Sequence, residues 1–412
     1  MATGSRLMTK LQAQTSIKKM RKAALTPWHI LTPEYPPQMG GVADYTRLVS
    51  DELAKSGDEV HVWGPNGIGG VEPSRPFVHN SLGTFGPRHL LRAGRLLNTF
   101  PEPRRLLVQW VPHGFGFRSM NVFFCLWLWA RAIRHGDQIE ITVHEPYLPF
   151  GGSWRQVIAA TVHRVMTVVL LRTTRSVWMT IPAWESRLRP YAFGRNVSFR
   201  WLPVPNNIPV DPNPHAESKI KQCYRGSRPL LLGHFGTHGG NVTCLLEQIL
   251  PALLRHRNDA AFLMMGSGSR DFRDRLVSME PWLSDRVHAT GSLAAEDLSH
   301  HISACDLILQ PDPDGISARR TSAMAALAHG RPMVTTLGHN SEEFWNNCDA
   351  VAITPVSNTD AYIAVTCRLL DDAGQRNKLG ERARLLYETR FDIRHVVAAL
   401  RDAREKTKAC VS

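Results

Sequence analysis

The sequence lacks several features that would define its class at once. Its seven cysteines contain no CxxC pair, which argues against a structural zinc site and against a disulfide framework. Scattered cysteines of this kind fit a reducing cytosol, so we expect a cytoplasmic protein. No cluster of His, Cys, Asp and Glu has the spacing of metal ligands, so we expect no metal site and no cofactor.

Long apolar runs are also missing. No run reaches the roughly 18 residues that a membrane-spanning helix needs, and the longest candidate, residues 122–129, is followed by Arg131. We therefore expect neither a transmembrane helix nor a signal peptide. The helical segment 121–134 around this run is unusually apolar, and it forms either part of a core or a membrane-facing surface.

Acidic residues are absent from residues 1–33, and the whole chain of 412 residues has a net charge of +13. We interpret residues 1–25 as a basic, disordered tail. The alternative is a basic amphipathic helix on an anionic membrane surface, which would place the protein peripherally at the inner face of the membrane. The basic modules with interleaved aromatic residues that bind RNA are missing, so we expect no nucleic acid partner.

What the chain does contain is a repeated alternation of short apolar runs and helical segments. The expected strands are residues 28–32, 60–63, 106–111, 139–144, 177–181, 199–202, 230–235, 261–265, 287–290, 306–310 and 333–336. The expected helices include residues 42–56, 121–134, 153–171, 242–254, 317–328, 360–370, 375–389 and 393–406, with another from Glu296. Residues 64–104 are expected to be irregular. This alternation predicts parallel sheets with helices on both faces.

A proline- and asparagine-rich stretch at residues 203–214 divides the alternation into two halves and is typical of a linker. We therefore predict an N-terminal domain at residues 26–205, a C-terminal domain at 206–390, and a closing helix and tail at 391–412. The expected fold class is α/β, with two tandem Rossmann-like domains. An interdomain cleft would be faced by the strand ends of both.

Residues 307–336, LILQPDPDGISARRTSAMAALAHGRPMVTT, show the alternation most clearly. Ser317 is the expected N-cap of the helix, which would put Arg319 and Arg320 in a first turn where the helix dipole disfavours positive charge. Two explanations remain open. Either the arginines pair with Asp312 or Asp314, or they join the free helix N–H groups in holding an anion such as a diphosphate.

Two further positions are candidates for ligand contact. Gly40 and Gly41 directly precede the helix 42–56, so a ligand can approach the backbone and the helix N-terminus there. Their spacing does not match the dinucleotide motif GxGxxG. His144 stands at the carboxyl end of a strand, where ligands bind in α/β sheets, although a lone histidine is as often structural.

Four motifs in order resemble one known family. LTPEYPPQMGGVADYTRLVSDELAKSGDEVHVW (31–63), ITVHEP (141–146), TGSLAAEDLSHHISACDLILQP (290–311) and AALAHGRPMVTT (325–336) are similar to segments of glycosyltransferases of the GT-B fold, in particular the retaining family four. The resemblance implies a nucleotide-diphosphate sugar in the C-terminal domain and an unknown acceptor in the N-terminal one. It also implies that His144 contacts the sugar and that glycines and the helix start near Ser317 face the diphosphate.

The site residues assigned on this basis fall into two groups. The donor-binding residues are Gly40, Gly41, Gly236, Gly239, Ser317, Arg319 and Arg320. The catalytic residues are His144 and Asp314.

The sequence departs from the family pattern at two places. The two glutamates that the family often carries eight residues apart fall here on Ser317 and Ala325, and Asp314 could replace the first only in a rearranged loop. The Arg and Lys that often follow the first strand of the second domain are missing from the loop GTHGGN at 236–241, so Arg319 and Arg320 would take over their charge. Glu342 and Glu343 are candidates for a ribose contact, or for a purely favourable position near a helix start.

These observations predict a metal-independent glycosyltransferase that moves a sugar from a nucleotide-diphosphate donor to an unknown acceptor. Retention of the anomeric configuration follows only from the family likeness. The alternatives are a non-catalytic binding protein with this fold and a sugar-nucleotide epimerase.

Overall fold

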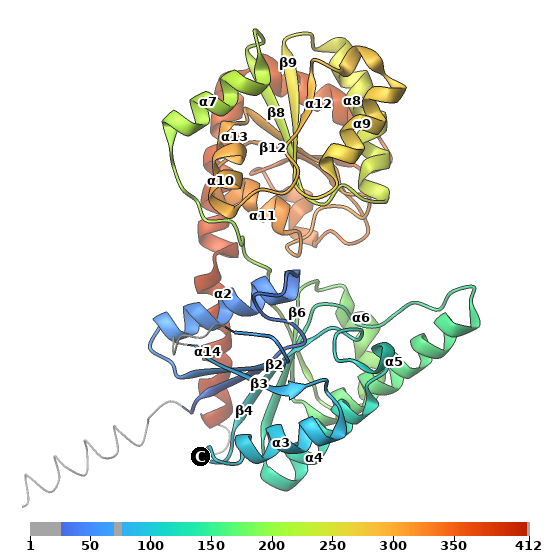
Figure 1. The fold of residues 1–412 in the computed structure, drawn as a ribbon, viewed down its shortest axis with the longest axis vertical. Helices are drawn as coiled ribbons and strands as arrows, with labels where there is room; N and C mark the ends of the chain where they lie inside the picture. Colours follow the sequence, from blue (N-terminus) through green and yellow to red (C-terminus); the bar gives the residue numbers. More distant parts are fainter. Residues whose placement is uncertain (1–25, 70–75, 410–412) are drawn as a thin grey trace, which may run out of the picture. The chain divides into compact units, whose positions relative to one another are not determined.

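The computed structural model describes residues 26–69 and 76–409, so the expected basic tail at residues 1–25 lies outside the described residues. The chain divides into two compact units. One unit comprises the residues up to Trp178 together with Leu188–Ser198, and the other comprises Met179–Arg187 and the residues from Phe199 onward. Each unit contains one sheet covered by helices, which confirms the α/β fold with two Rossmann-like domains (Figure 1).

The first sheet has seven strands in the order β3-β2-β1-β4-β5-β6-β7, and β1 pairs in parallel with β2 and with β4. Its strands are β1 Trp28–Leu31, β2 Val60–Pro65, β3 Phe77–Gly83, β4 Arg105–Trp110, β5 Gln138–Val143, β6 Ser176–Met179 and β7 Ser198–Trp201. Its main helices are α2 Gly41–Lys55, α3 Pro87–Leu97, α4 Val122–His135 and α5 Trp154–Thr173. Shorter pieces are η1 Phe117–Ser119 and η2 Arg189–Ala192, whereas α6 Trp184–Leu188 belongs, up to Arg187, to the second unit.

The second sheet has six strands in the order β10-β9-β8-β11-β12-β13. Its strands are β8 Leu230–Phe235, β9 Ala260–Met265, β10 Val287–Ala289, β11 Leu307–Gln310, β12 Met333–Leu337 and β13 Ala352–Pro355. The helices are α7 Pro214–Arg225, α8 Asn241–His256, α9 Ser269–Met279, α10 Ala295–Ala304, α11 Thr321–Ala328, α12 Thr359–Asp371, α13 Ala373–Leu386 and α14 Ile393–Ala409. Short 3-10 pieces are η3 Pro281–Leu283 and η4 Glu343–Asn347, and a π-helical turn, η5, spans Tyr387–Phe391.

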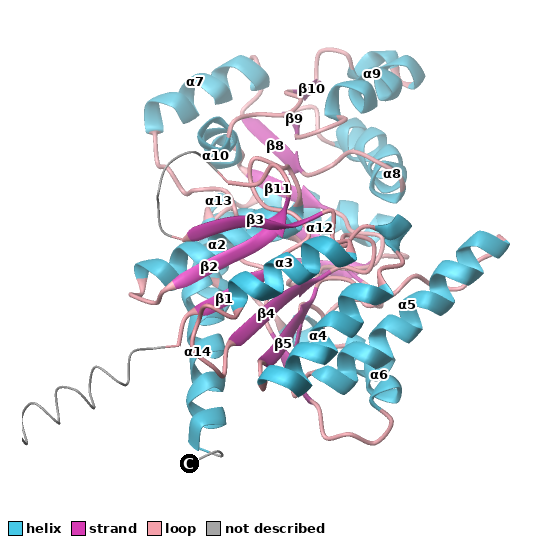
Figure 2. Ribbon diagram, turned by 60° about the horizontal axis from the view of Figure 1, so that its bottom comes forward, coloured by secondary structure: helices cyan, strands magenta, loops and turns pink. Residues whose placement is uncertain are grey.

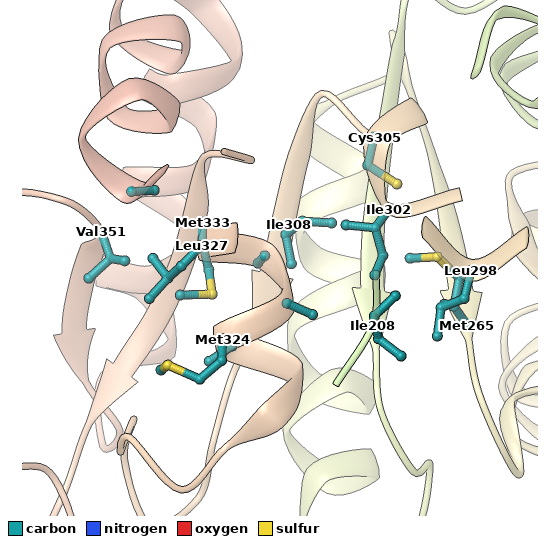
Figure 3. Packing of buried hydrophobic residues seen from close by; sticks show 14 of the residues in the cluster. Ile208, Met265, Leu298, Ile302, Cys305, Ile308, Met324, Leu327, Met333 and Val351 are labelled. Atoms are coloured by element: carbon teal, nitrogen blue, oxygen red, sulfur yellow. The ribbon is translucent and has the colours of Figure 1, made fainter. Parts of the chain in front are cut away.

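The second unit has a buried cluster on each face of its sheet, because successive side chains of a strand point to opposite faces. In β9, Ala261, Leu263 and Met265 face one buried cluster, whereas Phe262 and Met264 face another on the opposite side of the sheet. Figure 3 shows the first of these clusters, where side chains of α10, α11 and the strands interdigitate. Burial on both faces is the reason that these strands read as continuous apolar runs in the sequence.

Residues 64–104 were expected to be irregular, and this expectation was wrong for residues 77–97. They contain β3 and α3, and α3 buries Leu90, Ala93, Gly94 and Leu97 at helical spacing. The arginines between these positions point to solvent, and their number concealed the apolar stripe in the sequence. The strand β13 and the helices α7 and α9 were not expected either, and α11 starts four residues later than predicted.

The helices α3, α4 and α5 pack side by side on one face of the seven-stranded sheet (Figure 2). Among the described residues, no helix combines the length and the apolar character that crossing a bilayer requires.

Candidate functional site

The carboxyl ends of β9, β8 and β11 lie next to one another in the second sheet, and glycine-rich loops follow the first two. Gly236 donates its N–H to the carbonyl of Met265 at 3.1 Å, and His238 donates to the carbonyl of Ser267 at 2.9 Å. A Cβ atom at Gly266, whose φ is +114°, would lie 2.2 Å from the carbonyl oxygen of Gly236. The two loops therefore touch through their backbones, and glycine at 266 is required for this contact.

A strand-end cluster of His234, Gly236, Gln310 and Ser322 gathers at this edge. A Cβ atom at Gly236 would lie 3.7 Å from His234 Nε2, 3.9 Å from Gln310 Nε2 and 4.0 Å from Ser322 Cβ. Gln310 Nε2 donates to Ser322 Oγ at 2.8 Å. Among the described residues, the buried atoms His234 Nε2 and Gln310 Oε1 have no hydrogen-bond partner. The cluster therefore presents two acceptor atoms that lack donors.

The protonation state of His234 follows from its surroundings. Its Nδ1 donates to the carbonyl of Leu309 at 2.9 Å. Burial, with a smaller contribution from the nearby His238, lowers the pKa of His234 to about 3, and the Leu309 hydrogen bond opposes the shift. Its imidazole is therefore neutral at physiological pH, and Nε2 is an acceptor for a hydroxyl or N–H group.

The helix α11 begins beside this cluster with Thr321 and Ser322 in its first turn. Within the described part of the chain, no side chain caps this helix, and Arg320 occupies the N-cap position. The expected N-cap at Ser317 is wrong, and so is the placement of Arg319 and Arg320 in the first turn. An uncapped N-terminus leaves N–H groups and the positive end of the helix dipole facing outward from the helix.

The late start of α11 has a clear physical cause. Ile316 donates its N–H to the carbonyl of Thr336 at 2.8 Å, and the Ala318 carbonyl accepts from Val204 N at 2.9 Å. Ala318 N also donates to both carboxylate oxygens of Glu342, at 2.9 and 3.2 Å. Residues 316–318 are thus hydrogen-bonded to other segments, so they do not join the helix that their composition favours.

Glu342 has no free oxygen for the ribose contact considered from the sequence. Its Oε2 also accepts from Trp345 Nε1 at 2.7 Å, and the residue is buried. Burial raises the pKa of Glu342, and the hydrogen bonds from Ala318 and Trp345 oppose the shift. Its carboxylate therefore holds the 316–320 loop, whereas Glu343 is exposed at the start of η4.

The two arginines have partners inside the second unit. Arg320 Nη2 donates to Asp312 Oδ1 at 2.9 Å, Arg320 Nε pairs with Asp312 Oδ2, and Nη2 lies 3.5 Å from Asp314 Oδ2. The pairing explanation is therefore confirmed for Arg320. The guanidinium carbon of Arg319 lies 5.6 Å from the ring centroid of Trp184. Asp314 remains a predicted catalytic residue, and its carboxylate is held between Arg320 and His339.

The remaining donor-binding glycines stay predictions, and the structure places each of them. At the N-terminus of α2, Glu34 Oε1 accepts from Val42 N and Ala43 N, both at 3.0 Å. A Cβ atom at Gly40 would lie 2.2 Å from the same oxygen, so Gly40 makes room for Glu34. The anion at this helix start is thus a side chain of the protein itself. At Gly41 and Gly239, a Cβ atom would meet nothing within 4 Å.

His144 directly follows β5, as expected, and is buried. Its Nε2 lies 2.8 Å from Gln109 Oε1, and its ring meets Tyr45 edge-on at a centroid distance of 4.9 Å. With the amide oxygen as acceptor, Nε2 carries the proton and Nδ1 is the acceptor. His144 therefore has a fixed orientation at the strand ends of the first unit.

His234, Gln310, Ser322 and Arg270 were not among the site residues expected from the sequence. The first two stand in the last two residues of predicted strands, so the rule that singled out His144 would have found them. Arg270 lies in the first turn of α9, directly after the Gly266–Gly268 loop, and donates to the Thr290 carbonyl at 2.8 and 3.1 Å. Within the described ranges no carboxylate pairs with its guanidinium, which lies beside the glycine loops.

Comparison with known proteins supports a single class. Residues 228–372 match the family model described as glycosyl transferases group 1. The fold is similar to sucrose-phosphate synthase from Thermosynechococcus elongatus (TM-score 0.68, 16% identity, 93% of this chain and 100% of that chain). It is also similar to HepE from Anabaena in complex with UDP (0.66, 16%, 92% and 100%). A third similar structure is the UDP-forming α,α-trehalose-phosphate synthase from Burkholderia xenovorans (0.61, 13%, 92% and 100%). No curated protein matches the sequence.

The chain therefore has the GT-B fold, and it is an enzyme of the glycosyltransferase class. More narrowly, residues 228–372, which include the strand-end cluster and α11, form a domain of the glycosyl transferases group 1 family.

Proposed function

We propose that this enzyme transfers a sugar from a nucleoside-diphosphate donor to an acceptor, with retention of configuration and without a metal ion. The observation that supports this most directly is the strand-end cluster beside the uncapped N-terminus of α11. The neighbouring structures with UDP in their descriptions make a uridine nucleotide the first donor to test.

The chemistry of the two features is complementary. Outward-facing N–H groups and the dipole of α11 suit the anionic oxygens of a diphosphate. The acceptors His234 Nε2 and Gln310 Oε1 suit hydroxyl donors, which a ribose and a sugar both carry. We propose that the donor lies with its phosphates at α11 and a hydroxyl group at the strand-end cluster.

Departure of the nucleoside diphosphate increases negative charge on its phosphate oxygens, and the site must stabilise that charge. One well-placed donor in such a position contributes about 3 kcal/mol. Arg320 is already paired with Asp312, so we assign the principal cation of the site to Arg270 and a secondary one to Arg319, whose guanidinium lies over the Trp184 ring. Together with the helix N–H groups, these cations supply the countercharge that metal ions supply in other sugar-nucleotide enzymes. Turnover is then expected to be unchanged by a chelator.

We further propose the roles assigned from the family resemblance. His144 would contact the transferred sugar, Asp314 would act on the donor, and the unidentified acceptor would bind to the first unit. Gly40, Gly41, Gly236, Gly239 and Ser317 would line the donor.

A thermal-shift titration with UDP, GDP and ADP tests donor binding. A nucleotide at 100 times its Kd stabilises the folded protein by about 2.7 kcal/mol, which is readily detected. If none of the three nucleotides raised the unfolding temperature at millimolar concentration, the proposal would be refuted.

Product analysis by NMR tests the reaction itself. Transfer or slow hydrolysis of the donor, with an α-linked product from an α-linked donor, is expected. Conversion of the donor sugar to an epimer without any acceptor would instead establish an epimerase. Donor binding with neither transfer nor hydrolysis would favour a binding protein.

A further inference from the structure

The helices α3, α4 and α5 form a surface whose composition is unlike that of the rest of the protein. They comprise 11, 14 and 20 residues, and their sequences contain no aspartate or glutamate. Eight arginines lie on them: Arg88, Arg92, Arg95, Arg131, Arg134, Arg155, Arg164 and Arg172. We call the exposed side of these three helices the α3–α5 face.

Almost all of this positive charge is uncompensated. Arg131 is buried and pairs with Asp137 at 2.6 Å. In the described ranges, the other seven arginines pair with no carboxylate. Arg155, Arg164 and Arg172 instead lie over the aromatic rings of Trp154, Tyr147 and Phe150, and Phe193. Besides Asp137, the carboxylate of Glu102 also approaches these helices, with Oε1 at 3.1 Å from His135 Nδ1 at the end of α4.

The same face carries exposed apolar side chains. Ten of the twenty large apolar side chains that are exposed in the described part of the chain lie on these helices. They are Leu91, Leu96, Phe123, Leu126, Trp129, Ile133, Trp154, Val157, Ile158 and Val165. Phe123, Ile133 and Trp154 are 56, 63 and 69% exposed. Monomeric soluble proteins rarely expose a contiguous apolar surface of this kind without a partner.

The spacing shows that the exposed side chains form stripes. In α4, Phe123, Leu126 and Ile133 lie on the side opposite to the buried Phe124 and Leu128. In α5, Val157, Ile158 and Val165 stand 3, 4 and 11 residues after Trp154, so the four side chains lie on one side of the helix. Because α4 packs against both α3 and α5, the stripes are neighbours on one side of the unit (Figure 2).

We propose that the α3–α5 face docks on the surface of an anionic lipid bilayer. Apolar side chains in stripes, tryptophans, and arginines at their margins are the composition of helices that lie in the interface of a membrane. The apolar side chains would enter the boundary between headgroups and acyl chains, and the arginines would reach the headgroup phosphates. The three helices would lie on the bilayer, and none would cross it.

Charge complementarity favours an anionic bilayer over two other partners, a second copy of the chain and a nucleic acid. A second copy of the chain would bring the same uncompensated arginines against each other, which opposes self-association. A nucleic acid would satisfy the arginines but would leave the apolar stripes of α4 and α5 in contact with charged backbone. An anionic bilayer satisfies both parts of the face at once.

Flotation of the full chain with vesicles tests the proposal. Vesicles of phosphatidylcholine with and without 30 mol% phosphatidylglycerol are compared, and we expect binding that needs the anionic lipid and weakens with salt. The variant Arg88→Glu/Arg92→Glu/Arg95→Glu should lose about fivefold in partitioning for each positive charge removed. The variant Phe123→Glu/Ile133→Glu should bind at least tenfold more weakly than the wild type.

Matched controls separate this face from the rest of the chain. Met279→Glu/Leu385→Glu replaces two similarly exposed apolar side chains of the second unit, and it should bind as the wild type does. All variants should keep their thermal unfolding temperature and their nucleotide affinity, because the substituted side chains are exposed and lie outside the donor site. Equal vesicle binding by all variants would overturn the proposal and would assign the binding to residues 1–25 or another surface.

Depth-dependent quenching gives an independent readout. Brominated acyl chains quench tryptophan within the interface, so Trp154→Phe should remove part of the quenching and Trp282→Phe, in the second unit, should not. The proposal would be overturned if the wild type bound no vesicles. It would also be overturned if sedimentation showed that the wild type self-associates and that Phe123→Glu/Ile133→Glu abolishes this self-association.

Discussion

Ala318 donates its backbone N–H to the carboxylate of Glu342, 24 residues later in the chain, at 2.9 Å. This contact, together with the Trp345 hydrogen bond to the same carboxylate, explains why α11 starts at Thr321 and not at Ser317. The start of that helix in turn decides which side chains stand at its N-terminus. A buried acid therefore sets the geometry of the candidate donor site without facing a ligand.

Glu342→Ala should lower both the stability and the nucleotide affinity. It leaves the buried N–H groups of Ala318 and Trp345 without acceptors, at a cost of about 1–3 kcal/mol each. Urea unfolding and UDP titration are the measurements. Glu343→Ala, at the neighbouring exposed position, is the control and should change the free energy of unfolding by less than about 0.5 kcal/mol. Unchanged stability in Glu342→Ala would contradict the role of this carboxylate.

Arg320→Ala should reduce stability more than it reduces nucleotide binding. The substitution leaves the buried Asp312 without its ion-pair partner, and we expect a loss of about 1–3 kcal/mol, because Arg320 is partly exposed and its pair is only partly desolvated. Asp312→Asn in the same chain should restore most of the stability. If nucleotide affinity falls and the melting temperature does not, Arg320 serves the ligand in spite of its pairing with Asp312.

Gln310→Met should weaken binding of the sugar nucleotide about tenfold, because the variant keeps the length of the side chain but loses the acceptor Oε1. Calorimetric titration with UDP and with a UDP-sugar measures the effect. The free energy of unfolding should fall by about 0.5–1.5 kcal/mol, because methionine also removes the hydrogen bond from Gln310 Nε2 to Ser322 Oγ. Wild-type affinity in this variant would show that the strand-end cluster lies away from the donor.

His144→Ala should reduce turnover with a smaller effect on nucleotide affinity, since His144 is proposed to contact the transferred sugar and belongs to the other unit. His144→Phe is the informative control, because it preserves a ring against Tyr45 and removes the nitrogens. Steady-state kinetics and UDP titration of both variants are needed. An equal loss of turnover and affinity would contradict the assignment.

Acid should destabilise the first unit through His29. Burial lowers the pKa of His29 to about 3, with smaller contributions from the neighbouring His61, His79, Arg104 and Arg131. The unfolded state therefore binds a proton below the ordinary pKa of 6.5, whereas the folded state does not until about pH 3. The stabilisation is complete above pH 6.5 and is lost as the pH falls, by up to about 1.4 kcal/mol per pH unit.

Urea unfolding between pH 7.5 and 4.5 measures this dependence. His29→Gln retains a side-chain acceptor for Trp63 Nε1, which now donates to His29 Nδ1 at 3.2 Å, and cannot titrate. The variant should show a shallower loss of stability with acid. A slope identical to that of the wild type would assign the acid sensitivity to other groups, such as His79, whose pKa burial also lowers, to about 4.

Much of the fold could be predicted from the amino acids because local chemistry carries the information. Apolar runs of strand length alternate with helical segments. The strands other than β3 and β13, and the helices α2, α4, α5 and α8, lie within a few residues of their expected positions. His144 was found for the same reason, since a polar residue that ends an apolar strand is visible in the sequence. The enzyme class could be predicted as well, from the order of four motifs and not from any one of them.

What only the tertiary structure decided depends on contacts between segments far apart in the chain. The pairing of Arg320 with Asp312 could be expected as one of two explanations, but the Glu342 contact that delays α11 could not, because no local pattern connects residues 318 and 342. Likewise, His234, Gly236, Gln310 and Ser322 converge only because β8 and β11 are neighbours in the sheet. The face formed by α3, α4 and α5 also required the fold, since an apolar helix in a sequence is equally compatible with a core. Packing one side of each helix on the sheet left the other side, with its arginines, at the surface.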